Sequence, residues 1–127
     1  MLIFYYAKSS AAYAPHILLE EIGLDYKAVK IDFLTTEQRS PVYLEINPKG
    51  RVPALVTKKG VLTETPAILA YLAQISPEKK LAPTDPFEFA VAQAFNSYMA
   101  STVHVAHAHK HRGARWADDP SAHEAMR

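Results

Sequence analysis

The sequence has no cysteine among its 127 residues. Disulfide bonds, zinc–thiolate sites and a cysteine nucleophile are therefore excluded, and nothing in the composition indicates an oxidising compartment. No apolar run approaches the roughly 20 residues that a membrane-spanning helix needs. The apolar start, residues 1–7, is too short for the core of a signal peptide and has no basic lead-in. We therefore expect a cytoplasmic protein.

The chain also lacks an excess of charge of either sign. Lys and Arg together number 14 and Asp and Glu 13, for a net charge of +1 with His neutral. Such a balance creates no overall field that would attract nucleic acid or a membrane surface, so we expect neither as a partner. Hydrophobic residues make up 49% and charged residues 21%, which is typical of a soluble globular protein.

The first part of the sequence alternates between strand and helix patterns. Short apolar or alternating runs predict strands, and apolar residues at spacings of three and four predict helices. A strand, a helix and a second strand in close succession form a right-handed βαβ unit, which predicts that the first two strands are parallel. The expected elements are a strand at 2–6, a helix over 15–22, a strand at 26–31, a helical turn at 41–46, strands at 54–57 and 61–63, and a helix over 66–75.

This order, β-α-β followed by a connecting segment and then β-β-α, predicts an α/β domain of the thioredoxin-like kind with a mixed four-stranded sheet over residues 1–76. Residues 77–85 are rich in proline and are typical of a linker. A long helix is expected from 87 to about 111, with more apolar surface than one partner can cover. Because only the start of another helix, 121–127, follows it, we interpret 86–127 as a truncated all-helical domain.

Two short motifs carry most of the information about function. Val52-Pro53 directly precedes a predicted strand, where a cis bond would leave the Val52 N–H and C=O unpaired at a sheet edge. An extended peptide can add to such an edge as a short extra strand. Glu64-Thr65 precedes a helix, with Thr65 as the expected N-cap and Pro66 as the first helical residue. Free N–H groups there attract a carboxylate, while Glu64 can hold an ammonium.

Each motif also has a plainer interpretation. Val52-Pro53 can be a simple strand entry and Thr65-Pro66 a simple helix cap, because such dipeptides are common. Their combination, in this order and on this fold, favours a peptide ligand with an amino-acid head group. Arg51, next to the first motif, either binds a carboxylate of such a ligand or is a solvated turn residue.

Several sequence blocks carry a resemblance to a known family. They are Tyr5-Tyr6, Ser10, Pro15-His16-Ile17, Gly23-Leu24-Asp25, the segment INPKGRVPAL at 46–55, Leu62-Thr63-Glu64-Thr65, the segment ILAYL at 68–72, and Ser101-Thr102-Val103-His104. With these blocks the chain resembles the bacterial, beta-like cytosolic glutathione S-transferases along its whole length, and the 46–55 block is the most specific. The resemblance implies a complete glutathione-binding first domain and the opening of a helical second domain.

The resemblance also implies roles for individual residues. In that family the valine before a cis-proline bonds the cysteinyl backbone of glutathione, and a Glu-Ser/Thr pair holds its γ-glutamyl group. These roles fall on Val52, Pro53, Glu64 and Thr65. Glutathione is then a co-substrate whose thiol is conjugated to an electrophilic small molecule by a homodimer. The alternatives are a glutathione-dependent isomerase, dehalogenase or peroxidase on the same fold, or a non-catalytic interaction module.

The chain departs from the family at one position that matters for chemistry. Beta-class members place a cysteine at the start of the first helix, where this sequence has Ala11, so glutathione cannot be stored covalently there. The remaining task is to stabilise the thiolate of bound glutathione, since a free thiol has a pKa of about 8.5. Ser10, Ser9 and Tyr6 are the candidate hydroxyl donors. Ser9-Ser10 can instead be a helix cap; the pair is also similar to zeta-class isomerases, although the Cys and Arg that follow it there are absent.

Residues for the second substrate are predicted less directly. Tyr13 follows the candidate serines and either borders the second-substrate site or packs in the core. Ser101 and His104 lie in the stretch that resembles the family's cleft-facing helix. His104, His107 and His111 share one helical face, a spacing that can ligate a metal. No carboxylate is interleaved and neighbouring Lys and Arg residues repel a cation, so we expect no metal and a pocket role or solvation instead.

Overall fold

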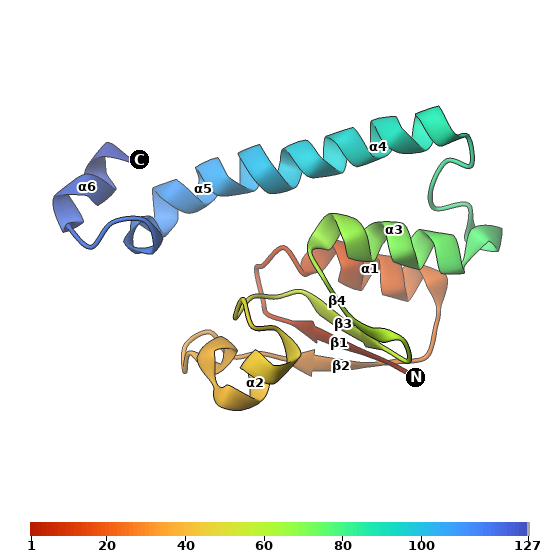
Figure 1. Ribbon diagram of the computed structural model, residues 1–127, viewed down its shortest axis with the longest axis horizontal. Coiled ribbons are helices and arrows are strands. Elements are labelled where there is room, and N and C mark those ends of the chain that lie inside the picture. The colour runs from red at the N-terminus through yellow and green to blue at the C-terminus, as the bar shows by residue number, and fades with distance from the viewer. Residues whose placement is uncertain (127) are drawn as a thin grey trace. The chain divides into compact units, whose positions relative to one another are not determined.

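The computed structural model of the protein describes residues 1–126. The chain divides into two compact units, Met1–Ala82 and a second that begins at Pro83 (Figure 1). The boundary falls within the segment predicted as a linker, 77–85, which also contains the 3₁₀ turn η2 (Pro77–Lys79). In the described part of the chain, no helix combines the length and apolar character needed to cross a membrane.

The first unit is built on a four-stranded mixed sheet with the order β2-β1-β3-β4. β1 pairs with β2 in parallel, as the βαβ pattern predicts, whereas β3 is antiparallel to both β1 and β4. The strands predicted at 54–57 and 61–63 form a hairpin, and the second begins at Gly60, one residue earlier than expected. The strands are β1 (Leu2–Tyr6), β2 (Tyr26–Lys30), β3 (Ala54–Thr57) and β4 (Gly60–Thr63).

Two helices, α1 (Tyr13–Ile22) and α3 (Thr65–Ile75), cover one face of this sheet (Figure 1). Each helix buries most of its predicted apolar stripe, because only that side can reach the sheet. The exception is Ile75 at the end of α3, which is 42% exposed. Gly23, at a φ of 75°, ends α1 with its N–H bonded to the Leu19 carbonyl. The buried residues that form the core are Phe4, Ala12, Leu19, Ile22, Leu55, Ile68 and Leu72.

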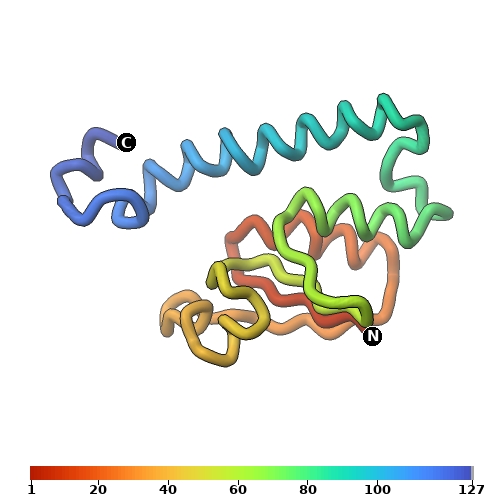
Figure 2. Tube along the Cα trace, viewed as in Figure 1, coloured from red at the N-terminus to blue at the C-terminus, as the bar shows by residue number. Residues whose placement is uncertain are grey.

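The connecting segment between β2 and β3 contains the short helix α2 (Pro41–Ile46), as predicted, and an unpredicted 3₁₀ turn, η1 (Glu37–Arg39). Figure 2 follows this segment, orange to yellow, from β2 to the start of β3. The Tyr43 ring of α2 contacts Tyr5 of β1 edge-on, with centroids 5.6 Å apart. This contact holds the connecting segment against β1, which places residues 47–53 at the sheet.

The second unit is helical throughout its described elements. Asp85 is the N-cap of its first helix, and its Oδ1 accepts 3.0 Å hydrogen bonds from the N–H groups of Phe87 and Glu88. The helix predicted over 87–111 is present with one π-helical interruption. A final helix begins at Pro120; residue 127, to which it was predicted to extend, lies outside the described residues. The elements are α4 (Pro86–Tyr98), the π-helical η3 (Met99–Val103), α5 (His104–His111), the 3₁₀ turn η4 (Gly113–Arg115) and α6 (Pro120–Ala125).

Candidate functional site

The peptide bond between Val52 and Pro53 is cis, as the sequence predicted for this position. Pro53 is buried and directly precedes β3, whereas Val52 is half-buried. No hydrogen bond within residues 1–126 uses the N–H or C=O of Val52. An unpaired donor and acceptor on one residue beside a strand can pair with an extended peptide.

Two buried side chains hold the residue before Val52 in place. The Tyr43 hydroxyl and the Asn47 amide nitrogen Nδ2 both donate 2.7 Å hydrogen bonds to the Arg51 carbonyl. Burial raises the pKa of Tyr43 to about 12, so its hydroxyl remains protonated and continues to donate across the neutral range. In the sequence Asn47 stood out only as part of the block at 46–55, and nothing there predicted its bond to the Arg51 carbonyl.

Gly50 is required in the same loop for steric reasons. Its φ is +60°, in the left-handed region that favours glycine, and a Cβ there would lie 2.8 Å from the Gln38 carbonyl oxygen. The Gly50 N–H donates to the Asn47 carbonyl at 2.8 Å. The loop can therefore turn close against η1 only with glycine at this position.

The second part of the site is the N-terminus of α3. We predicted Thr65 as its N-cap, and this is wrong: the helix begins at Thr65 and Glu64 is the N-cap, without a side-chain capping bond. The Thr65 hydroxyl instead donates to the Ala11 carbonyl at 3.3 Å. Pro66 has no N–H, and the N–H groups of Thr65 and Ala67 find no partner among the described residues. This helix end is therefore open to an anion.

Glu64 itself has an unusual backbone conformation, with φ 71° and ψ 124°. A positive φ is rare for a residue other than glycine and costs about 1–3 kcal/mol, and such residues cluster at ligand sites. The Glu64 side chain is exposed and its Oε1 lies 2.6 Å from Lys49 Nζ. Lys49 Nζ also lies 3.4 Å from Thr63 Oγ1. The role of Lys49 was not predictable from the sequence, because nothing local connects it with a residue fifteen positions later.

Two of the candidate hydroxyl donors, Ser9 and Ser10, lie in the turn between β1 and α1. The bond from Thr65 to the Ala11 carbonyl ties this turn to the start of α3. Ser10 Oγ donates to the Ala7 carbonyl at 2.7 Å and accepts from the Ala12 N–H at 3.2 Å, so its proton is already engaged. Ser9 is exposed, and none of the hydrogen bonds within residues 1–126 involves its hydroxyl.

Tyr6 and Tyr13 differ in their surroundings. The Tyr6 ring lies against His16, with centroids 4.8 Å apart, and stacks on Phe4 at 6.3 Å. Tyr6 therefore packs among the aromatic residues on the core side of β1. Tyr13, at the start of α1, is 70% exposed and free to meet a ligand.

The remaining predicted residues belong to the second unit. Ser101 lies on the π-helical η3 with its Oγ 3.5 Å from Thr102 Oγ1, and His104 begins α5. The His107 and His111 rings lie 4.8 Å apart, as expected one helical turn from each other. Among residues 1–126, no three or more His, Asp or Glu side chains converge as metal ligands. How these residues relate to the second substrate stays a prediction.

A cavity of about 420 Å³ lies at the C-terminal end of α5. Of the histidines considered in the sequence analysis, His111 lines it, whereas the residues proposed for glutathione do not. His109 contacts Trp116 beside it, with ring centroids 4.1 Å apart, and His123 Nε2 lies 2.7 Å from the Ala117 carbonyl. The lining residues are His109, Lys110, His111, Arg112, Gly113, Ala114 and His123.

A mixed β2-β1-β3-β4 sheet with two helices on one face and a cis-proline before β3 defines the first unit as a thioredoxin-like domain. More particularly, the chain belongs to the glutathione S-transferase family: the family model described as "Glutathione S-transferase, N-terminal domain" matches residues 1–74. The family resemblance noted in the sequence is thereby confirmed.

Similar proteins include both transferases and isomerases. A maleylacetoacetate isomerase of Pseudomonas aeruginosa is 34% identical over 110 residues, which are 84% of this chain and 52% of that protein. A glutathione transferase homologue from Sulfitobacter, solved with bound glutathione, is 50% identical with a TM-score of 0.94, covering 99% of this chain and 61% of that one. A beta-class enzyme from Sphingomonas chungbukensis is 32% identical with a TM-score of 0.81, covering 98% and 62%. The chain spans about half the length of the curated relatives it matches.

Proposed function

We propose that the first unit, Met1–Ala82, binds glutathione along Val52 and at the start of α3. The cysteinyl backbone of the ligand pairs with the unpaired N–H and C=O of Val52. The γ-glutamyl carboxylate accepts from the open N–H groups of Thr65 and Ala67, while its ammonium bonds to Glu64. The observation that carries this proposal is that both unpaired backbone sites lie in one unit. The Lys49–Glu64 ion pair joins the loop that carries Val52 to the start of α3.

The glycyl end of glutathione carries a second carboxylate. Arg51 is exposed and adjacent to Val52, and its guanidinium can bind a carboxylate in a bidentate manner. Because Tyr43 and Asn47 hold the Arg51 carbonyl, the start of this side chain has a defined position. Arg51 therefore completes a set of contacts to all three charged groups of the ligand.

The chemistry proposed for the bound thiol is stabilisation of its thiolate. A donor hydroxyl and backbone N–H groups favour the charged sulfur and so increase the amount of nucleophile at neutral pH. Ser9 can donate without losing an existing bond, whereas Ser10 must first release the Ala7 carbonyl. Tyr6 is the third candidate. To donate to the sulfur, its hydroxyl must extend beyond the aromatic side chains that contact its ring.

For the complete protein we propose transfer of the glutathione sulfur to an electrophilic small molecule by a cytoplasmic homodimer. Tyr13, Ser101, His104 and His107 are the proposed contacts of the electrophile. Positioning of the two reactants and stabilisation of the thiolate account for the acceleration in this mechanism.

Titration of the chain with reduced glutathione, followed by amide NMR, tests the binding proposal. We expect the largest shifts at Val52, Thr65 and Ala67, at concentrations within the usual range of about 1 μM to 1 mM for such substrates. Oxidised glutathione and free glutamate serve as ligand controls. Shifts confined to the cavity beside α5, or none up to about 10 mM, would contradict the proposal.

A matched pair of variants sharpens this test. Glu64→Gln removes the charge that receives the ammonium and is expected to weaken glutathione binding on the order of tenfold. Glu88→Gln, in the first turn of α4, makes the same chemical change in the other unit and is expected to leave the dissociation constant unchanged. Equal effects of the two substitutions would show that Glu64 is not a binding residue.

A second candidate function is glutathione-dependent isomerisation. It is favoured by the relative named maleylacetoacetate isomerase and by the Ser9-Ser10 pair. In the complete protein, parallel assays with an aryl halide and with maleylacetoacetate separate the two reactions. Turnover of maleylacetoacetate without conjugation of the halide would show that the reaction is isomerisation and not transfer. The proposed glutathione site would be unaffected by that result.

A further inference from the structure

Lys49 occupies the place at Glu64 where the proposed ligand needs to bind. Its ammonium nitrogen lies 2.6 Å from Glu64 Oε1 and 3.4 Å from Thr63 Oγ1. The α-amino group of glutathione is also an ammonium, and under the proposed function it bonds to the same carboxylate. Two ammonium groups held at one carboxylate repel each other, so binding of the ligand's amino group disfavours the Lys49 bond.

We propose that Lys49 is an internal substitute for the ligand's ammonium, and that glutathione binds by exchanging its amino group for Lys49 on Glu64. The inference rests on the proposed function, since it assigns a partner to the same carboxylate. In the unliganded chain Lys49 keeps Glu64 neutralised and oriented. On exchange Lys49 is released as a free cation beside a ligand that carries one more negative than positive charge at neutral pH.

The exposure of the pair makes exchange physically reasonable. The Lys49 and Glu64 side chains are 56% and 62% exposed, so solvent screens their attraction and the pair is weak. A lysine ammonium is a point charge on a flexible stem, whereas an arginine would hold the carboxylate through a rigid fork. The residue type therefore favours a partner that can be displaced.

Lys49 also has a defined starting position. Its backbone N–H donates to Asn47 Oδ1 at 3.2 Å, and the Asn47 side chain is buried and bonded to the Arg51 carbonyl. The same asparagine thus orders both the loop that carries Lys49 and the residue before Val52. Displacing the Lys49 side chain leaves this backbone arrangement, and with it the Val52 edge, intact.

The exchange predicts how much the ligand's amino group contributes to binding. We compare glutathione with its des-amino analogue, in which hydrogen replaces the α-amino group. In the unaltered chain the gain in affinity from the amino group is reduced, because the amino group must displace Lys49. In Lys49→Met no competitor is present, so the ratio of the two dissociation constants, analogue over glutathione, should rise roughly two- to fivefold.

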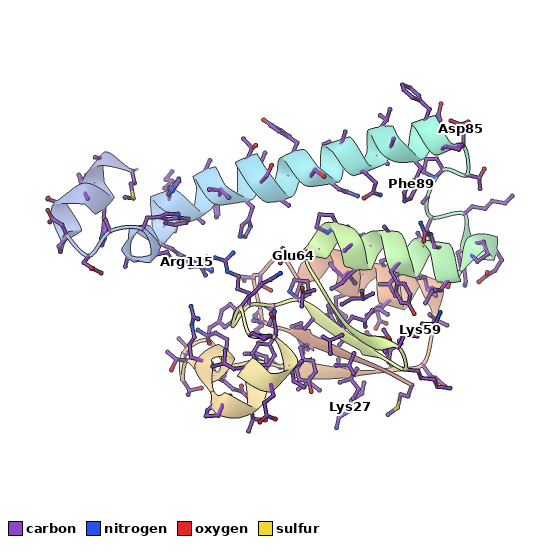
Figure 3. The ribbon with its side chains drawn as sticks, viewed as in Figure 1. Lys27, Lys59, Glu64, Asp85, Phe89 and Arg115 are labelled. Atoms are coloured by element: carbon purple, nitrogen blue, oxygen red, sulfur yellow. The ribbon has the colours of Figure 1, made fainter. Side chains whose placement is uncertain are left out.

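The control is Lys59→Met. Lys59 lies at the β3–β4 turn, and Glu64 lies beyond the other end of β4, where α3 begins (Figure 3). This variant removes the same charge from the same unit without touching Glu64, so it corrects for the general loss of positive potential. We expect its ratio of dissociation constants to equal that of the unaltered chain.

A second measurement needs no variant. The ε-methylene and ammonium NMR signals of Lys49 should move toward those of a free lysine when glutathione binds, and should stay unchanged when the des-amino analogue binds. The exchange would be wrong if the Lys49 signals stayed at their ion-paired positions with both ligands. It would also be wrong if the ratio of the two dissociation constants were the same in Lys49→Met as in the unaltered chain. Binding of neither ligand to the unaltered chain would overturn the proposed function as well, which distinguishes the two failures.

Discussion

Two helices of similar length, α3 and α4, differ in what surrounds their apolar residues. α3 has 11 residues and buries Ile68, Leu72 and Ala73, whereas α4 has 13 and, in the part of the chain that the structure describes, buries none. Both carry a proline in the first turn and large apolar side chains at helical spacing. α3 packs on α1 and the sheet. Apolar periodicity therefore specifies a helix, but burial depends on the presence of a second element.

The strongest test of this difference is one substitution in each unit. Phe4→Ala, at a fully buried position of β1, is expected to lower the free energy of unfolding of the first unit by about 3–5 kcal/mol. Phe95→Ala, at a position of α4 that is 63% exposed, is expected to change the free energy of unfolding of the second unit by less than about 0.5 kcal/mol. Urea unfolding followed through amide signals of each unit measures both.

If Phe4→Ala proves too unstable to study, Phe4→Leu retains an apolar side chain and gives a smaller loss in the same direction. Equal losses at the two phenylalanines would mean that the second unit has a core comparable to that of the first.

Glycines offer a second contrast between the units. Gly50→Ala combines a φ of +60° with a Cβ 2.8 Å from a backbone carbonyl, and we expect a loss of about 2–3 kcal/mol in stability together with weaker glutathione binding. Gly113→Ala meets the His123 side chain at 2.9 Å, and a side chain can move, so we expect about 1 kcal/mol or less. Thermal unfolding ranks the two, and the reverse order would show that the loop at Gly50 relaxes easily.

The smallest expected effect concerns pH. Burial raises the pKa of Tyr43 to about 12 from about 10 in the unfolded chain, so the folded state binds the proton more tightly. The stability contributed by this proton is fully present below about pH 10 and is lost as the pH rises toward 12. Tyr43→Phe should remove that part of the alkaline loss and, by deleting the bond to Arg51, cost about 1 kcal/mol at neutral pH.

Tyr98→Phe is the control for this measurement. Tyr98 is 55% exposed on α4, and we expect its loss of a hydroxyl to leave stability at neutral pH within about 0.5 kcal/mol. An alkaline unfolding curve that is the same for Tyr43→Phe and the unaltered chain would show that Tyr43 is not the group responsible.

Most secondary structure was predictable because it depends on residues close in sequence. The stripes of α1 and α3 predicted their buried faces, and the handedness of βαβ units predicted the parallel pairing of β1 with β2. The cis bond before Pro53 also had a local signal, since the residue types and the following strand pattern are adjacent. The π-helical turn at 99–103 had no recognised signal, and the sequence predicted an uninterrupted helix there.

Contacts between distant segments were not predictable in the same way. Thr65 looked like an N-cap from its neighbours, but its hydroxyl bonds to Ala11, 54 positions away, and the cap moves to Glu64. Ser10 looked like an available donor, but its hydroxyl is engaged with the Ala7 carbonyl. A hydroxyl can satisfy several partners equally well, so only the folded arrangement decides between them.

By itself the sequence determined the order of strands and helices and the block that carries the family resemblance, because short-range spacing encodes both. Only the tertiary structure decided that Lys49 meets Glu64 and that the Arg51 carbonyl is held by Tyr43 and Asn47. The physical reason is that charged and polar side chains have many possible partners of similar energy. Packing of the sheet and its loops brings one of those partners within reach and excludes the rest.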